Sequence, residues 1–307
     1  MTTNAIIAVA LALCAALASA IGDVIRQRSA QEVTDKERVG HLELFRMSLR
    51  DVRFWGGGVA AVANYGLQAA ALVYGSVMLV TGLQVTALLF ALPIYARLTR
   101  HGVSRAEWWW AAVLAAALAV VVIVGDPEEG SHRAPSAMWI TVGVVLVSAL
   151  VACVVVARIF SGRPAAAVLL AVVAGTSLAV FAVLTKVLVD TLRADGAMAV
   201  LRAPELLPWL AATLAGMIFQ QSSFRAGALT ASMPTITVAK PLVATVLGVL
   251  LLNETIDAGG TEDVAVAIGV VMVVVATVAL ARGEAATMAA RSGGRDTTWS
   301  EPLPSTG

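Results

Sequence analysis

The chain has 307 residues, of which 59% are hydrophobic and 13% are charged, and its formal net charge is +1 at pH 7. Soluble domains contain about 45–50% apolar and about 25% charged residues, so this composition excludes an ordinary soluble domain. A net charge so close to zero gives no reason to expect a nucleic-acid partner. We therefore expect an all-α polytopic membrane protein.

Long apolar runs predict the membrane-spanning helices. A helix needs roughly 20 mostly apolar residues to cross the hydrocarbon core, and about nine runs of that kind follow one another along the chain. The polar end of the chain, residues 283–307, is rich in Gly, Ser, Thr and Pro and is expected to be a disordered cytoplasmic tail. In chain order the predicted spans are Ala5–Val24, Phe54–Gly75, Ser76–Leu98, Trp108–Val124, Met138–Ala157, Ala165–Val189, Leu206–Phe224, Leu229–Leu252 and Val264–Ala281.

The segment between the first two spans, residues 26–53, is long for this chain. Within it Leu42, Phe45, Leu49 and Val52 recur at helical spacing, with arginines on the other faces. This pattern favours a short amphipathic helix on the inner membrane surface, and a solvated loop is the alternative.

The distribution of Lys and Arg predicts the orientation, because cytoplasmic loops carry an excess of basic residues. Nine spans place nearly all basic loop residues on one side, which is therefore cytoplasmic. The N-terminus is expected outside and the C-terminus inside a cell membrane, most simply a bacterial inner membrane. The other side receives only Arg133, Arg193 and Arg202.

A weak internal repeat relates the second and seventh predicted spans. Gln68 aligns with Gln220 and Gly75 with Gly227, and in both copies the following span contains proline. The two copies lie an odd number of spans apart, so they cross the membrane in opposite directions. Inverted-topology repeats are typical of secondary transporters, whose substrate site lies near mid-membrane between the repeats. We expect a first repeat of four spans (1–125) and a second of five (137–282).

Two segments carry a family resemblance. The segment SFRAGALTASMPTITVAKPLVATVLGVLLLNETI resembles the last EamA-type unit of the drug/metabolite transporter superfamily, including its closing acidic motif, here Asn253-Glu254. The segment NYGLQAAALVYGSVMLVTGLQVTALLFALPIYARL resembles the matching first-half region, including that of the magnesium-transporter-like branch. The resemblance implies a five-plus-five transporter fold. In this chain the amphipathic segment stands where a second span would be, which leaves four plus five.

Lys240 is the most informative candidate site residue because it lies at the centre of its predicted span. A charge at that depth costs at least about 2.5–3.5 kcal/mol on insertion scales. Pro241 deprives the Thr237 carbonyl of its helical partner, so that carbonyl could accept from the lysine. Our hypothesis is that Lys240 faces a central cavity and meets an anionic group of the substrate. The alternative is a lysine satisfied by carbonyls and water.

Other polar residues lie within the apolar spans. Such side chains commonly form hydrogen bonds between helices, and the repeat-related pair Gln68 and Gln220 is the best candidate for lining a cavity. Candidates for gating or coupling are the prolines of the eighth span and the acid at the inner end of the first. Substrate-binding candidates besides Lys240 are Gln68, Gln220, Asn64, Tyr65, Gln221 and Gln84, and gating or coupling candidates are Asp23, Pro234 and Pro241.

Three further side chains have structural interpretations. Asp23 lies three residues before Arg26, a spacing that allows an ion pair on the helix surface as an alternative to gating. Lys186 lies three residues from the outer end of its span and is expected to extend to the outer surface. Cys14 and Cys153 are expected to be buried thiols without a disulfide.

No enzymatic, metal-binding or cofactor-binding motif is visible, so we expect neither an enzyme nor a cofactor. The leading hypothesis is a secondary transporter that moves a small organic solute by alternating access. The alternatives are a non-transporting accessory membrane subunit and a flippase for a lipid-linked intermediate. A divalent-cation transporter is less favoured, because Mg²⁺ prefers carboxylate oxygens and the deep charge here is a lysine. The expected partners are a small-molecule or lipid-linked substrate and membrane lipids. A monomer, a homodimer or a membrane-protein partner all remain open.

Overall fold

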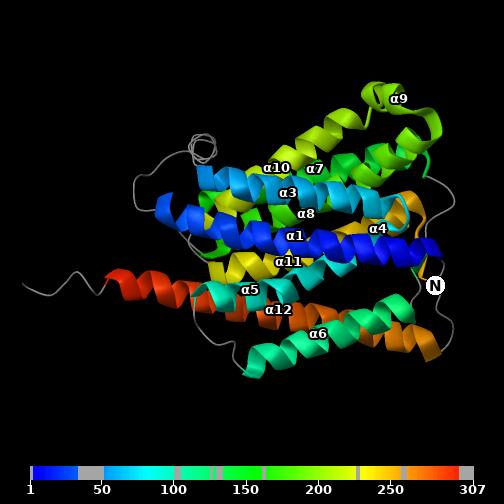
Figure 1. The fold of residues 1–307 in the computed structure, drawn as a ribbon. Helices are drawn as coiled ribbons and strands as arrows, with labels where there is room; N and C mark the ends of the chain where they lie inside the picture. Colours follow the sequence, from blue (N-terminus) through cyan, green and yellow to red (C-terminus); the bar gives the residue numbers. More distant parts are fainter. Residues whose placement is uncertain are drawn as a thin grey trace, which may run out of the picture.

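The structure is a computed structural model that describes residues 3–33, 52–99, 105–124, 127–128, 134–160, 164–225, 229–256 and 261–296. These residues form a helical bundle with one two-residue β-ladder (Figure 1). The helices are α1 (Thr3–Val33), α3 (Val52–Leu72), α4 (Val77–Leu83), the 3-10 turn η1 (Gln84–Thr86), α5 (Ala87–Thr99), α6 (Arg105–Ile123), α7 (Ser136–Ile159), α8 (Pro164–Asp195), α9 (Ala197–Arg202), α10 (Leu206–Arg225), α11 (Leu229–Leu252) and α12 (Thr261–Asp296).

Every predicted span overlaps one of these helices, and the eighth, Leu229–Leu252, coincides with α11. The third predicted span contains a 3-10 turn, and α4, η1 and α5 together occupy it. By length and hydropathy, four helical stretches of the described part could cross a membrane: Thr3–Gly22, Ser136–Ile159, Ala165–Asp195 and Thr235–Leu252. Shorter apolar stretches lie at Val59–Leu72, Val77–Ala91 and Val264–Leu280.

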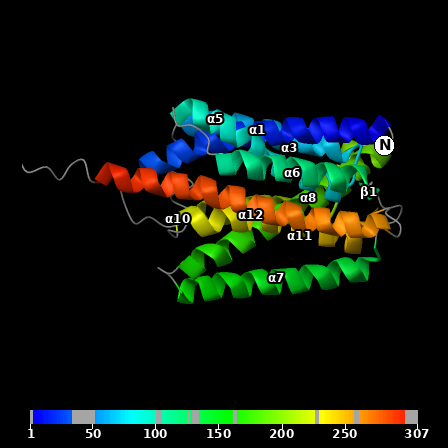
Figure 2. The ribbon, with the colours of Figure 1, turned by 90° about the horizontal axis from the view of Figure 1, so that it is seen from below.

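Helices α4 and α8 form the centre of the bundle. The largest buried cluster joins α4 side chains, such as Leu79 and Val80, to residues of α1, α3, α8 and α11. A smaller cluster packs α6 against α12 around Leu114 and Leu280. In contrast, α7 lies at the edge of the bundle (Figure 2). Only 6% of its apolar stretch is buried, whereas 78% of the apolar stretch of α8 is buried.

Small residues bring the helices close together. A Cβ placed on Gly75 would lie 2.8 Å from the Cβ of Ala8, and one on Gly175 would lie 2.8 Å from the Cβ of Ala239. Glycine and alanine at helix contacts allow close approach of backbones, as in membrane bundles. The contact at Gly175 sets the distance between α8 and α11 next to Lys240, whose backbone nitrogen would lie 3.3 Å from the added Cβ.

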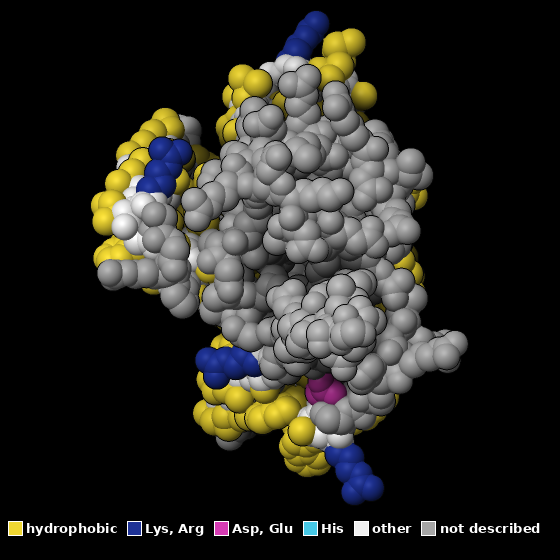
Figure 3. Space-filling model, turned by 90° about the vertical axis from the view of Figure 1, so that its left-hand side faces the viewer, with side chains coloured by type: hydrophobic (Ala, Val, Ile, Leu, Met, Phe, Trp, Pro, Cys, Tyr) yellow, Lys and Arg dark blue, Asp and Glu magenta, His cyan; other side chains and the backbone are white. Residues whose placement is uncertain are grey.

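One end of the bundle gathers the N-terminus of α1, the α3–α4 turn, the end of α11 and the start of α7. Here β1 (Pro127–Glu128) pairs antiparallel with β2 (Thr255–Ile256), and the Ala134 N–H donates to the Leu251 carbonyl at 3.0 Å. Figure 3 shows the opposite end, where Lys and Arg side chains lie at the rim and hydrophobic side chains cover the flanks.

Two further predictions, for the C-terminal tail and for the cysteines, need correction, and a third, for the amphipathic segment, lies mostly outside the described residues. Helix α12 continues to Asp296, so residues 283–296 are helical where a disordered tail was predicted; Ala, Glu, Met and Arg in this stretch are strong helix formers that extend the preceding helix. Residues 26–33 continue α1, whereas 34–51, with most of the expected amphipathic helix, lie outside the described residues. Both cysteines are free, but neither is buried: Cys14 is exposed and Cys153 is partly exposed.

Candidate functional site

Lys240 contacts the 3-10 turn η1, which lies within the helical run from α4 to α5. Its ammonium group donates a hydrogen bond to Oε1 of Gln84, the first residue of η1. The side chain of Gln84 is buried against α3, and the residue is only 9% exposed. A 3-10 turn within a helical run often marks a functional hinge, so the central lysine of α11 binds at the point where the α4–α5 span changes its helical form.

The hydrogen bonding continues from Gln84 into α3. Nε2 of Gln84 donates to Oε1 of Gln68 at 2.8 Å and lies 3.5 Å from Oδ1 of Asn64. Asn64 and Gln68 are four residues apart, so they share one face of α3. Both are buried, with Gln68 fully inaccessible. We call the four residues Lys240, Gln84, Gln68 and Asn64 the polar relay.

The lysine fixes the direction of the polar relay, because an ammonium group can only donate hydrogen bonds. Gln84 must therefore turn its oxygen to Lys240 and its nitrogen to Gln68. Gln68 in turn presents its oxygen to Gln84, which leaves its Nε2 buried without a hydrogen-bond partner. Among the described residues, Oγ1 of Thr277 is the only other buried side-chain polar atom without a hydrogen-bond partner. The relay thus begins at a cation and ends at an unused N–H donor.

The other sequence candidates are placed differently. Tyr65 lies beside the polar relay on α3, and its ring packs edge-on against Phe181 of α8 with centroids 5.0 Å apart. Gln220 and Gln221 lie on α10 and are not part of the relay, so the repeat-based pairing of Gln68 with Gln220 does not bring the two side chains into one set of contacts. Pro241 follows Lys240 in α11. Asp23 and Pro234 lie within α1 and α11, but their side chains are outside the described part of the structure.

A second polar cluster, which the sequence did not predict, surrounds the α3–α4 turn. Glu254 is 2% exposed, and its carboxylate accepts hydrogen bonds from the backbone N–H groups of Val77 at 2.6 Å and Met78 at 2.9 Å. Ser76 caps the same helix by accepting from the Leu79 N–H at 3.1 Å. A carboxylate at a helix N-terminus is favoured both by the unpaired N–H groups and by the helix dipole. Glu254 thus holds the start of α4 from the far end of α11.

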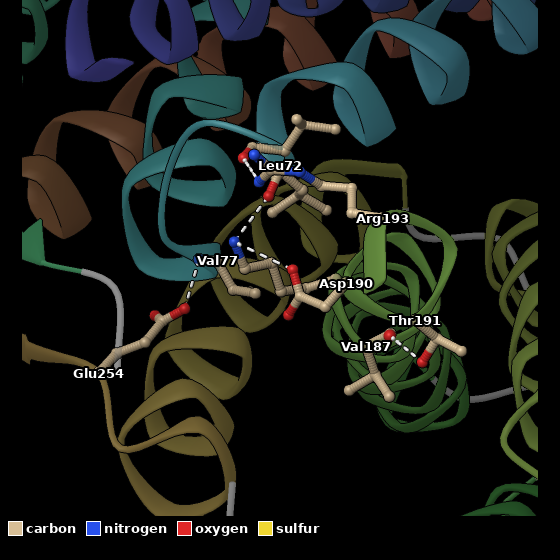
Figure 4. Close-up of polar contacts among 9 residues, drawn as sticks. Leu72, Val77, Val187, Asp190, Thr191, Arg193 and Glu254 are labelled. Carbon is tan, nitrogen blue, oxygen red and sulfur yellow. Dashed lines mark hydrogen bonds and ion pairs between the residues drawn. The ribbon is translucent and has the colours of Figure 1, made fainter. Parts of the chain in front are cut away.

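Basic side chains hold the other side of this turn (Figure 4). The Lys186 ammonium donates to the carbonyl of Leu72 at 2.7 Å and lies 3.7 Å from the Asp190 carboxylate, and Arg193 donates to the carbonyl of Val73 at 2.7 Å. Cations are favourable at a helix C-terminus for the same electrostatic reason. The prediction that Lys186 extends to the outer surface is wrong, because the residue is only 5% exposed.

Local backbone features bring Glu254 into place. Asn253 adopts a left-handed conformation with φ 53°, which ends α11 and turns the chain back. The Glu254 N–H then donates to the Gly248 carbonyl at 3.1 Å. A Cβ on Gly248 would lie 2.5 Å from Oε2 of Glu254, so only glycine leaves room for the carboxylate. The signal in the sequence is this spacing of Gly248, Asn253 and Glu254.

We expect Lys186→Met to reduce stability without affecting the polar relay. Removal of the ammonium group leaves the Leu72 carbonyl buried without this donor, which should lower the free energy of unfolding by about 1–3 kcal/mol. Equilibrium unfolding of the purified protein in mixed micelles would measure the change. An unchanged free energy of unfolding would show that Lys186 does not stabilise the turn.

The fold and site define an all-helical protein with several helices long and apolar enough to cross a membrane. No protein-family model matches the sequence, and no solved structure matches it. The chain is 32% identical over 277 residues to an uncharacterized protein of Corynebacterium glutamicum, a match that covers 90% of this chain and 95% of that relative. The protein therefore belongs to the same family as this corynebacterial protein.

Proposed function

We propose that the chain is a multi-pass membrane protein with about nine spans, arranged as two inverted repeats of the drug/metabolite transporter type. One support is the outer face of α7, where Ile140, Val144, Val147 and Val151 recur at helical spacing and are each more than half exposed. Monomeric soluble proteins rarely expose so large an apolar surface. The basic rim in Figure 3 supports a cytoplasmic assignment for that end, with the N-terminus outside.

We infer that the protein is a secondary transporter that moves a small organic anion or zwitterion by alternating access. The observation that carries this proposal is the polar relay, which joins a lysine at the centre of α11 to the 3-10 turn at Gln84 and to α3. Secondary transporters bind substrate near mid-membrane between their repeats, and a polar site at this depth fits that plan.

The chemistry of the polar relay favours an anionic group on the substrate. Lys240 supplies positive charge, and the buried Nε2 of Gln68 supplies N–H donors that no described residue accepts. Buried polar groups are nearly always hydrogen-bonded, and one left unpaired costs about 1–3 kcal/mol. A carboxylate oxygen would accept from such an N–H donor and would be attracted by the positive charge of Lys240. Mg²⁺ would need oxygen ligands, and the ammonium group would repel it.

Thermal stabilisation of the purified protein would test the proposal. The panel would contain monocarboxylates, dicarboxylates and amino acids, each carboxylate paired with its neutral amide. A compound that binds only the folded state stabilises it by about 2.7 kcal/mol at a concentration of 100 Kd. We expect at least one carboxylate to raise the melting temperature while its amide does not, and the same compound to be taken up by proteoliposomes.

The outcomes separate transport from its alternatives. Binding without uptake or counterflow would contradict the transporter and favour an accessory subunit. Stabilisation by the amides as strongly as by the carboxylates would contradict the anionic substrate class. Stabilisation by a lipid-linked phosphate alone would favour the flippase.

A further inference from the structure

Helix α4 is the first segment of a helical run that continues through the 3-10 turn η1 into α5. It has seven residues, and Leu83, Gln84 and Ala87 all keep right-handed helical backbone angles where it passes into η1 and α5. All of its residues except Gly82 are buried. A glycine-containing turn precedes α4, and Ser76 at its start has an extended backbone, so the N–H groups of the first turn need partners outside the helix. Contacts with neighbouring elements therefore help to set where the start of α4 lies along the bundle axis.

Two polar contacts tie α4 to α11, one at each end. At the N-terminal end Glu254 accepts from the Val77 and Met78 N–H groups. At the C-terminal end Lys240 donates to Gln84, the residue directly after α4. Leucine and valine side chains of both helices fill the space between the two contacts.

The two contacts are separated by similar lengths along both helices. From Val77 to Gln84 the run α4–η1 advances seven residues, which corresponds to about 10.5 Å of helix. On α11, the Glu254 carboxylate lies over Gly248, eight residues beyond Lys240 and about 12 Å along the axis. A shift of the run by one helical turn would move Gln84 about 5.4 Å along the axis from Lys240. The contact at Glu254 therefore helps to set which residue of the α4–η1 segment meets the lysine.

We propose that Glu254 is a positioning residue for the substrate site: through α4 it sets the placement of Gln84 against Lys240, so that α4 and the second half of α11 behave as one unit. The proposal rests on the proposed function only in taking the Lys240–Gln84 pair as a substrate contact. The mechanical coupling does not depend on transport. An ordinary helix cap would stabilise only the first turn of α4, whereas a positioning residue also controls η1.

Hydrogen exchange measured by mass spectrometry on the full chain in micelles tests this difference without a ligand. The two segments to follow are 77–80, at the start of α4, and 84–87, around η1. We expect Glu254→Gln to speed exchange about tenfold in both segments, and Lys240→Met to speed it only in 84–87. Gly248→Ala displaces the carboxylate without changing its charge and should reproduce the Glu254→Gln pattern.

Asp190→Asn is the matched control, because it removes a carboxylate that pairs with Lys186 on the other side of the same turn. It should leave exchange at 84–87 unchanged, and residues 176–184 of α8 should exchange at the wild-type rate in every variant that folds correctly. If Glu254→Gln also speeds exchange in residues 176–184 of α8, that variant is not folded correctly. The proposal is then tested by exchange at 77–80 and 84–87 in Gly248→Ala. Faster exchange confined to 77–80 would overturn the proposal, as would a wild-type rate in both segments.

Discussion

Replacing Lys240 by methionine should abolish recognition of an anionic substrate while the protein remains folded. A hydrogen bond to a charged group contributes about 1.5–3 kcal/mol, so the affinity for the carboxylate found in the stabilisation panel should fall about 10- to 150-fold. Removing a charge from the centre of a span also relieves an insertion cost of about 2.5–3.5 kcal/mol. This gain offsets the loss of the donor to Gln84, so stability should be unchanged or increased.

Lys186→Met is the matched control for this experiment. Both lysines lie in predicted spans, and both replacements remove one positive charge and keep a side chain of similar length. Lys186 contacts the Leu72 carbonyl, outside the polar relay, so its replacement should lower stability and leave substrate affinity unchanged. Binding measured by the ligand-induced shift in melting temperature would compare the two variants. Equal losses of affinity in both would contradict the assignment of Lys240 as the substrate contact.

The positions of the apolar spans were predictable, because hydropathy marks them. A run of about 20 apolar residues is a strong signal, and α11 begins and ends where the sequence indicates. The 3-10 turn at Gln84 within the third span was not predictable, because no residue from Val77 to Thr86 interrupts the apolar run strongly enough. The polar relay was predicted in its members on α3 and α11, and Gln84 was among the candidates, but their contacts required the fold.

The polar cluster at the α3–α4 turn was missed for a physical reason. Glu254 follows a span and reads as a loop acid, and Lys186 lies close enough to a span end to reach water. Their actual partners are backbone groups more than one hundred residues away. Hydropathy contains no information on which helix ends are neighbours, whereas every unpaired backbone group at a buried helix end needs a partner. Glu254 and Lys186 are the partners of such backbone groups at the α3–α4 turn.

Replacing Glu254 by alanine should cause a larger loss of stability than any other replacement proposed above. The carboxylate is the acceptor for two buried N–H groups, and each hydrogen bond to a charged group contributes about 1.5–3 kcal/mol. The free energy of unfolding should therefore fall by at least about 3 kcal/mol. Glu254→Gln keeps one acceptor oxygen but turns an N–H₂ group toward a backbone donor, so its loss should be smaller than that of alanine.

Ser76→Ala provides the scale for this measurement, because it removes the other acceptor at the same helix end without removing a charge. Loss of a serine N-cap typically costs about 1 kcal/mol. Equilibrium unfolding in mixed micelles, followed by circular dichroism, should order the variants with wild type most stable, then Ser76→Ala, Glu254→Gln and Glu254→Ala. If Glu254→Ala cost no more than Ser76→Ala, the carboxylate would be a replaceable cap, and α4 would be held in place by its apolar packing against α8 and α11 alone.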